Sequence, residues 1–188
     1  MKEIELFNGA YGLVSVNNTD ELIIRHILDS LAPLRIILRL LDEKSGIRIA
    51  DAGSGAGLPG IPLAIALPDC EFTLIEKMGR RAGFLLNTKA VLGLSNVIIE
   101  EGELEKTAPG QFDLVTFRAF KPLEPKLLKT LFRACRNEGI IAAYKGRREK
   151  IEAETAPLEK LYEKLETIAY TTPFLDEERH LVVIRPKQ

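Results

Sequence analysis

The amino-acid sequence predicts an α/β fold in which helices cover both faces of a mostly parallel β-sheet. From Gly46 onward, short strand segments alternate with helical segments, as in a chain of βαβ units. A glycine-rich turn lies between the first strand and the helix that follows it. Two consecutive strands at the end of the chain predict an antiparallel edge to the sheet.

The length and composition fit a single globular domain. The chain has 188 residues, of which 46% are hydrophobic and 28% are charged, as expected for a soluble protein with a buried core. No apolar run has the length of a signal peptide or a membrane span, so we expect a cytoplasmic protein without membrane contact. We also expect a monomer. Cys70 and Cys135 lack the spacing of metal ligands, and we expect no metal site.

Residues 1–45 are predicted to form a helical cap ahead of a core at residues 46–188. Asn18 has the side chain of a helix N-cap, and Glu21 follows it at capping-box spacing. Apolar residues then recur at helical spacing, at Ile23, Ile27, Leu31 and Leu34. Pro33 bends or breaks this stretch, and a second helical piece runs to about Leu41.

The core contains seven predicted strands with helices between them. The strands are predicted at residues 47–51, 72–76, 97–99, 112–117, 139–144, 166–171 and 181–185. The helices are predicted from about residue 59 and at residues 80–92, 123–135 and 149–165. This order is the layout of the Rossmann-like class I methyltransferases, and such sheets bind ligands outside the carboxyl ends of their strands.

The strongest local signal is the segment Asp51–Gly60, which contains four glycines between a predicted strand and a predicted helix. Glycines at such a junction permit a tight turn and a close approach of the backbone to a ligand. The amino terminus of the helix also presents free amide groups. The segment therefore predicts a cofactor loop rather than a plain turn.

Two cofactors fit this loop. Gly55, Gly57 and Gly60 match a dinucleotide-binding fingerprint, whereas Gly53, Gly55 and Gly57 resemble the first glycine motif of methyltransferases. Asp51 stands ahead of the glycines and favours S-adenosylmethionine, because a carboxylate can serve the cationic end of that cofactor.

Glu76 ends the second predicted strand, where an acidic side chain accepts hydrogen bonds from ribose hydroxyls. This residue suits either cofactor. A P-loop is excluded, because no Gly-Lys-Ser/Thr sequence follows the glycines.

The methyl acceptor is indicated by what the chain lacks. Enzymes that methylate an exocyclic amine usually carry an Asp/Asn-Pro-Pro-aromatic loop after the fourth strand, where this chain has Phe117-Arg118-Ala119-Phe120. Methylation of pyrimidine C5 needs a nucleophilic cysteine, and neither cysteine is predicted in a polar loop at a strand end. N7 of guanine has an in-plane lone pair and no proton, so positioning without a general base can suffice.

Arg118 is predicted at the carboxyl end of the fourth strand, as a catalytic and cofactor-binding residue. Its guanidinium can bind the cofactor, a phosphate or the acceptor atoms of guanine. Phe117 and Phe120 flank it and are predicted to offer a stacking surface. The alternative is a surface arginine paired with a nearby acid.

Two basic clusters follow predicted strands. One consists of Lys145, Arg147, Arg148 and Lys150, and the other of Lys77, Arg80 and Arg81. The first cluster is the better candidate for contact with RNA phosphates, whereas Arg80 and Arg81 fit a solvated helix start equally well.

The chain resembles the RsmG family, also called GidB, of 16S ribosomal RNA guanine-N7 methyltransferases. The resemblance runs from Phe7 almost to the end of the chain. It rests on Phe7-Asn8-Gly9-Ala10-Tyr11, Arg25-His26-Ile27-Leu28-Asp29-Ser30, the loop from Asp51 to Pro62, Arg118-Ala119-Phe120, Lys145-Gly146, and Glu178-Arg179-His180-Leu181-Val182-Val183-Ile184. The Gly-Leu-Pro-Gly-Ile-Pro extension and the Arg-His-x-x-Asp-Ser segment are its specific features.

The resemblance implies S-adenosylmethionine as cofactor and 16S ribosomal RNA or the small ribosomal subunit as partner. It implies cofactor contacts at Gly53, Leu58, Leu104, Glu105 and Arg118. It also implies that the substrate side is shaped by Arg25, His26, Asp29, Lys145, Arg179 and His180, and Arg147 lies in the same basic cluster as Lys145. The alternatives are an ordinary ion pair between Arg25 and Asp29 and structural roles for both histidines.

Two other functions remain open on the sequence. A nicotinamide-dependent oxidoreductase would use the same kind of loop, although the chain has no Tyr-x-x-x-Lys pair. A methyltransferase-like ribosome-assembly factor would bind RNA or cofactor without turnover.

Overall fold

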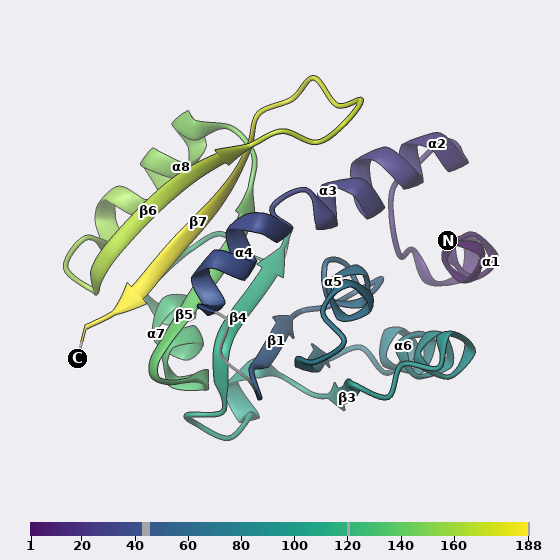
Figure 1. Ribbon diagram of the computed structural model, residues 1–188, viewed down its shortest axis with the longest axis horizontal. Coiled ribbons are helices and arrows are strands. Elements are labelled where there is room, and N and C mark those ends of the chain that lie inside the picture. The colour runs from purple at the N-terminus through teal and green to yellow at the C-terminus, as the bar shows by residue number, and fades with distance from the viewer. Residues whose placement is uncertain (43–45, 120, 188) are drawn as a thin grey trace.

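A seven-stranded sheet organises the protein in a computed structural model, which describes residues 1–42, 46–119 and 121–187 (Figure 1). The strand order is β3-β2-β1-β4-β5-β7-β6. The strands are β1 (Arg48–Ala52), β2 (Glu71–Glu76), β3 (Val97–Glu101), β4 (Phe112–Arg118), β5 (Cys135–Lys145), β6 (Tyr162–Tyr170) and β7 (Arg179–Pro186). The strands β1 to β5 pair in parallel, whereas β7 is antiparallel to both β5 and β6. The predicted mostly parallel sheet with an antiparallel edge is confirmed.

Helices cover both faces of this sheet. They are α1 (Lys2–Tyr11), α2 (Thr19–Leu22), the π-helical η1 (Ile23–Leu28), α3 (Asp29–Leu31), α4 (Leu34–Leu41), α5 (Gly60–Ala66), α6 (Gly79–Leu92), the 3₁₀ turns η2 (Leu104–Lys106) and η3 (Ala156–Leu158), α7 (Pro125–Ala134) and α8 (Arg148–Thr155). The helices of the amino-terminal segment, α5 and α6 pack on one face, and α7 and α8 pack on the other.

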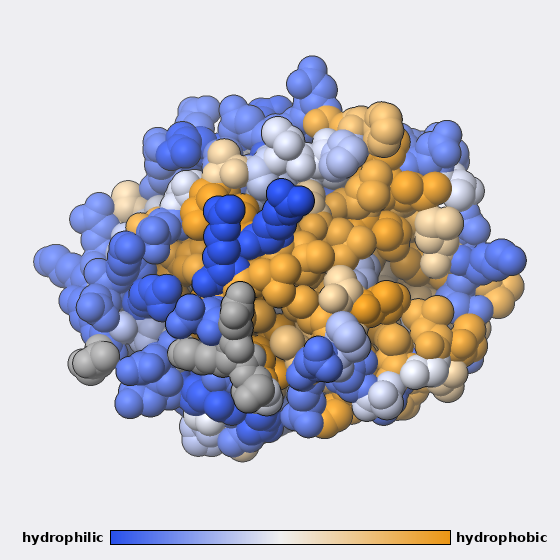
Figure 2. All heavy atoms as spheres, viewed as in Figure 1, coloured by the Kyte–Doolittle hydropathy of each residue, from blue (hydrophilic) through white to orange (hydrophobic). Residues whose placement is uncertain are grey.

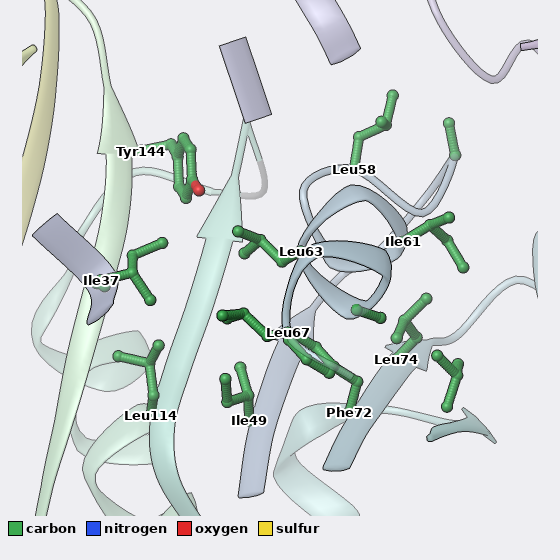
Figure 3. Packing of buried hydrophobic residues seen from close by; sticks show 14 of the residues in the cluster. Ile37, Ile49, Leu58, Ile61, Leu63, Leu67, Phe72, Leu74, Leu114 and Tyr144 are labelled. Carbon is green, nitrogen blue, oxygen red and sulfur yellow. The ribbon is translucent and has the colours of Figure 1, made fainter. Parts of the chain in front are cut away.

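Alternation along the strands produces two apolar cores. In β1, Ile49 belongs to the core on the α5 side and Ala50 belongs to the core on the α7 side. Figure 3 shows Ile37 of α4 directed toward Leu114 of β4, so the amino-terminal segment shares the first core. Figure 2 shows apolar side chains gathered across the face that carries α4 and α5, with polar side chains along the α8 and β6 side.

The amino-terminal segment begins with a helix whose end is fixed by a side chain. Gly12 has a left-handed conformation with φ of 57° and ends α1. The Oδ1 atom of Asn8 accepts hydrogen bonds from the N–H groups of Leu13 and Val14, both at 2.9 Å. The Asn8 of the family segment at residues 7–11 therefore has a structural role. The predicted N-cap is confirmed, because the N–H of Glu21 donates to Asn18.

One predicted helix is wrong in length. The charged helix expected at residues 149–165 ends at Thr155, and β6 begins at Tyr162. Pro157 lies in the 3₁₀ turn η3 that follows α8, and proline cannot continue an α-helix because it lacks an N–H donor. β5 also starts earlier than predicted, at Cys135 instead of Gly139.

Candidate functional site

The residues predicted for the site come together at the carboxyl edge of the sheet, in two neighbouring groups. The first group, at the ends of β1, β2 and β3, is the cofactor-loop group: Asp51, Gly53, Gly55, Gly57, Leu58, Glu76, Leu104 and Glu105. The second group lies at the ends of β4 and β5, at the start of β7 and in the helices η1 and α3 that pack beside them. It is the arginine cluster: Arg25, His26, Asp29, Arg118, Lys145, Arg147, Arg179 and His180. Because β7 is antiparallel, its first residues reach the same edge as the last residues of β5.

The side chain of Asp51 holds the glycine loop through hydrogen bonds. Its carboxylate is buried, and Oδ2 accepts hydrogen bonds from Oγ of Ser54 at 2.5 Å and from the N–H of Gly60 at 3.0 Å. Oδ1 is buried without a hydrogen-bond partner in the described part of the chain. Burial raises the pKa of Asp51 to about 6, although the bonds from Ser54 and Gly60 act to lower it. Oδ1 can therefore accept a hydrogen bond from a ligand or contact a cationic group of a ligand.

The glycines of the loop serve different purposes. Gly53, Gly55 and Gly57 have φ angles of 69°, 57° and 77°, which other residues rarely adopt. A Cβ on Gly57 would lie 2.5 Å from Cγ1 of Ile61, so Gly57 is also needed for packing against α5. A Cβ on Gly55 would meet nothing nearer than the carbonyl oxygen of Gly53 at 3.9 Å. Gly55 therefore marks the open side of the loop, where a ligand can approach the backbone.

Glu76 holds the loop from the neighbouring strand. Its Oε2 accepts a hydrogen bond from the N–H of Gly55 at 2.9 Å, and Oε1 accepts one from the N–H of Met78 at 2.8 Å. Each carboxylate oxygen has further acceptor capacity, so these bonds leave the acid able to accept from a ribose hydroxyl.

The rest of the cofactor-loop group lines the same end of the sheet. Leu58 and Leu104 are buried, whereas Glu105 is exposed. The guanidinium of Arg133 in α7 holds η2 by donating to the carbonyl oxygens of Leu104 at 3.2 Å and Glu105 at 2.8 Å. The open side of Gly55 gives a ligand access to the loop, and the unpartnered oxygen of Asp51 suits a ligand that carries a cationic group. S-adenosylmethionine is such a ligand.

Arg118 connects β4 to the amino-terminal helices. Nη1 donates to the carbonyl oxygen of Arg25 at 3.1 Å and to Oδ2 of Asp29 at 3.3 Å, and Nη2 lies 3.0 Å from Nδ1 of His26. Burial, followed by the charge of Arg118, lowers the pKa of His26 to about 4. The predicted pairing of Arg118 with an acid is present, but that acid belongs to the predicted site.

The π-helical turn η1 explains how a backbone carbonyl becomes available to Arg118. The N–H of Asp29 bonds to the carbonyl oxygens of Ile24, five residues earlier, and His26, three residues earlier, and not to that of Arg25, four residues earlier. The Arg25 carbonyl accepts from Arg118 instead. Single π-helical turns of this kind are often found at functional sites.

Asp29 joins three parts of the chain. Besides Arg118, its carboxylate accepts hydrogen bonds from Oγ1 of Thr172 at 2.8 Å and from Nε of Arg179 at 3.1 Å. The side chain of Asp29 is 5% exposed, so these contacts compensate a charge that is removed from water. The alternative of an ion pair between Arg25 and Asp29 is wrong, because Arg25 pairs with Glu177 at 2.7 Å.

Lys145 and His180 lie beside this cluster. Nζ of Lys145 forms an ion pair with Glu154 at 2.7 Å and lies 5.8 Å from the centre of the Phe117 ring. His180 is buried, and its Nδ1 lies 2.6 Å from the carbonyl oxygen of Gly146. His180 therefore fixes the Lys145-Gly146 turn, which is the structural role that the sequence offered as an alternative.

The predicted stacking surface is wrong for Phe117. This side chain is 1% exposed and belongs to the core on the α7 side, so no base can stack on it. Phe120, the other aromatic residue of that prediction, lies outside the described residues.

A hollow of about 1310 Å³ opens beside the arginine cluster. Its lining includes Arg118, Lys145 and Arg179, which are paired with acids, and the exposed Arg147 and Lys150. Within the described ranges, no ion pair joins Arg147 or Lys150 to an acid. These two side chains are therefore available to a polyanion. Arg81 of the other basic cluster instead donates to the carbonyl oxygen of Gly12 at 2.8 Å and braces α1.

Sequence reasoning missed four residues of this site. Thr172 and Glu177 hold the loop between β6 and β7, Glu154 binds Lys145, and the ring of Tyr170 packs edge-on against Tyr144. Glu177 adjoins the Glu178-Arg179-His180 segment and could have been included on that signal. Thr172 had none, because 143 residues separate it from Asp29.

The fold and the glycine-loop edge define a Rossmann-like methyltransferase that uses S-adenosylmethionine. The insertion of β7 between β5 and β6 also separates this sheet from the order 3-2-1-4-5-6 of dinucleotide-binding proteins, so the nicotinamide alternative is set aside. The family model described as rRNA small subunit methyltransferase G (GidB) matches residues 1–182. The chain belongs to this family, and the resemblance seen in the sequence is confirmed.

Relatives agree with this assignment, and solved structures agree with the fold. Proteins named ribosomal RNA small subunit methyltransferase G are 39% identical to the chain in Treponema denticola, over 98% of the chain and 83% of the relative, and 42% identical in Treponema pallidum, over 98% and 81%. A tRNA (m1A58) methyltransferase from Aquifex aeolicus has a similar fold, with a TM-score of 0.66 and 15% identity over 86% of this chain and 69% of that chain. None of the helices that the structure describes is long and apolar enough to cross a membrane.

Proposed function

We propose that this protein transfers a methyl group from S-adenosylmethionine to N7 of a guanine in 16S ribosomal RNA. Membership of the rRNA small subunit methyltransferase G family supports the substrate class. The choice of N7 rests on the bonding of those side chains around the hollow that could otherwise accept a proton. Of the acids that line this hollow, Asp29, Glu154 and Glu177 are each bonded to a cationic side chain. Glu178 accepts a hydrogen bond from the N–H of Arg148, and Asp176 is exposed to water. Nδ1 of His26 faces Arg118.

Because of these bonds, the buried and half-buried acids and Nδ1 of His26 are not available to abstract a proton. Methylation of N7 needs no proton abstraction, because the acceptor nitrogen is unprotonated and already nucleophilic. The demand on the chain is to hold the lone pair of N7 in line with the methyl group. When bound, S-adenosylmethionine supplies that methyl group in an electrophilic, sulfonium-linked form.

The two groups of residues divide this task. We propose that the cofactor contacts are made by Asp51, Gly53, Gly55, Gly57, Leu58, Glu76, Leu104, Glu105 and Arg118. Within this set, Asp51 offers its free oxygen to the cationic part of the cofactor and Glu76 accepts from the ribose. Gly57 acts through packing, and Gly55 gives access to the loop backbone.

The substrate side is assigned to the arginine cluster. Arg147 binds RNA phosphate, and Lys145 lies at the same rim. Arg25, His26, Asp29 and Arg179 hold the orientation of Arg118 and of the loop between β6 and β7, and His180 holds the turn after Lys145. Arg118 is assigned to positioning contacts, because methylated N7 leaves the guanine ring cationic and a second cation does not stabilise that charge.

We further propose that the protein acts as a cytoplasmic monomer, with residues 1–45 serving as a cap on a single methyltransferase domain. The core shared by Ile37 and Leu114 supports this view of the cap.

The test is methyl transfer from labelled S-adenosylmethionine to small-subunit RNA, supplied both free of protein and as assembled subunits. We expect labelled N7-methylguanosine after digestion to nucleosides, with one S-adenosylhomocysteine released for each methyl group. Binding of RNA and cofactor without S-adenosylhomocysteine release would contradict the proposal and would support the assembly-factor alternative.

A further inference from the structure

Phe174 lies in the loop between β6 and β7 and is exposed to an unusual degree. Its relative exposure is 87%, the highest among the large hydrophobic side chains that the structure describes as exposed. Its backbone φ is 63°, in the left-handed region that a bulky residue rarely adopts. Solvation and backbone energy both disfavour a phenylalanine here, which indicates that the ring serves a purpose outside the fold.

The loop that carries Phe174 is fixed on both sides. Thr172 donates to Asp29, the N–H of Leu175 donates to the carbonyl oxygen of Thr172 at 3.1 Å, and Glu177 pairs with Arg25. Further along, Oε2 of Glu178 accepts from the N–H of Arg148 at 2.9 Å. These bonds hold the turn that carries the exposed ring in place. The turn therefore loses little conformational freedom when a partner binds.

The loop that carries Phe174 lies beside the hollow on the acceptor side. Figure 1 shows the loop reaching beyond the carboxyl edge of the sheet, past the end of β6 and the start of β7. Asp176 and Glu177 of the same loop line the hollow that also contains Arg118 and Arg147. An RNA strand whose phosphates contact Arg147 and whose target guanine enters this hollow would pass the loop.

We infer that Phe174 stacks on an unpaired base beside the target guanine and thereby positions the RNA strand in the hollow. Single-stranded RNA is commonly recognised by aromatic side chains on which splayed bases stack. The ring takes the part that the sequence had indicated for Phe117, which is buried. This inference rests on the proposed RNA substrate.

The ring can be removed and replaced without disturbing the fold, because it is exposed. We expect Phe174→Ala to raise the KM for small-subunit particles about 10-fold, with unchanged binding of S-adenosylmethionine. Phe174→Gly should raise the KM equally, although glycine adopts the positive φ without strain, and this result separates loss of the ring from a change in the backbone. Phe174→Tyr keeps a stacking ring and should keep the KM. Leu6→Ala, at an exposed apolar position on α1, is the matched control.

A fluorescence measurement reports stacking directly, because the chain contains no tryptophan. The only indole of Phe174→Trp should be quenched when small-subunit RNA is added, whereas that of Leu6→Trp should not. An unchanged KM for both Phe174→Ala and Phe174→Gly would overturn the inference. A blue shift of the Phe174→Trp fluorescence without quenching would also overturn it, because such a shift indicates burial of the indole against protein. Failure of the wild-type protein to methylate RNA would instead overturn the proposed function.

Discussion

Nη2 of Arg118 lies 3.0 Å from Nδ1 of His26, and this contact fixes the protonation state of the imidazole. A guanidinium has donors and no acceptor, and it stays protonated in proteins. Nδ1 of His26 must therefore accept the hydrogen bond, which leaves the ring neutral. A second positive charge on this ring would face Arg118 across the same short distance.

This relationship predicts a pH-dependent stability. The folded-state pKa of His26 is about 4, below the usual value of 6.5. The contribution of neutral His26 to the stability of the folded protein is therefore fully present above about pH 6.5 and is lost as the pH falls toward 4. Between pH 7 and pH 4, we expect wild type to lose about 1 kcal/mol more free energy of unfolding than His26→Gln, after discounting for the screening of a half-buried ring. Urea unfolding at several pH values measures this difference.

The control is Leu6→Ala, which changes an exposed apolar side chain on α1 and no titratable group. This variant should retain the pH slope of wild type. Equal slopes for wild type and His26→Gln would show that the Arg118 contact does not keep His26 neutral.

Removal of the Arg118 side chain should uncouple β4 from the amino-terminal helices. We expect Arg118→Ala to remain folded and to lose about 10- to 100-fold in kcat/KM, because three hydrogen bonds of a charged group disappear. The loss should also be visible in the binding of cofactor or RNA, measured by calorimetry. Arg136→Ala removes an ion pair with Asp113 at the opposite edge of the sheet and should keep wild-type activity. A folded Arg118→Ala enzyme with full activity would refute the positioning role.

The glycine loop gives a prediction about the cofactor. In Gly55→Val, the branched side chain would fill the open side of the loop, and we expect at least about 10-fold weaker binding of S-adenosylmethionine by calorimetry. The strained φ of 57° should also cost about 1–2 kcal/mol of stability. Gly83→Ala, at an open position in α6, is the control and should bind normally. If a folded Gly55→Val protein binds as tightly as wild type, the cofactor lies elsewhere.

Neither cysteine is expected to take part in the reaction. Burial raises the pKa of both thiols, that of Cys135 to about 12, so neither is a ready nucleophile at neutral pH. Cys70 precedes β2, at the edge of the sheet opposite to the site, and Cys135 begins β5. The double variant Cys70→Ala, Cys135→Ala should retain methyl transfer close to wild type, apart from some loss of stability. A folded but inactive double variant would reopen a covalent mechanism on a pyrimidine.

The strands and the glycine loop could be predicted because their signals are local. The alternation in residues 47–51 and the spacing of glycines in residues 53–60 are visible without the rest of the chain. The partners of Asp29 could not be predicted, because Thr172 and Arg179 lie 143 and 150 residues away.

Other features depend on packing and not on local pattern. The π-helical turn at Ile23–Leu28 accompanies a contact with Arg118, and helical spacing alone does not distinguish it from an α-helix. The difference between Gly55 and Gly57 arises from the position of Ile61. The burial of Phe117 likewise follows from α7 and α8 covering that face of the sheet.

The central claim is methylation of guanine N7, and chemical cleavage of the RNA tests it most directly. N7-methylguanine makes an RNA chain cleavable by borohydride and aniline. Small-subunit RNA from cells that lack this protein should resist cleavage at the target guanine, and incubation with the enzyme and S-adenosylmethionine should create the cleavage site. RNA that gains labelled methyl groups from the enzyme but no such cleavage site would contradict the assignment to N7.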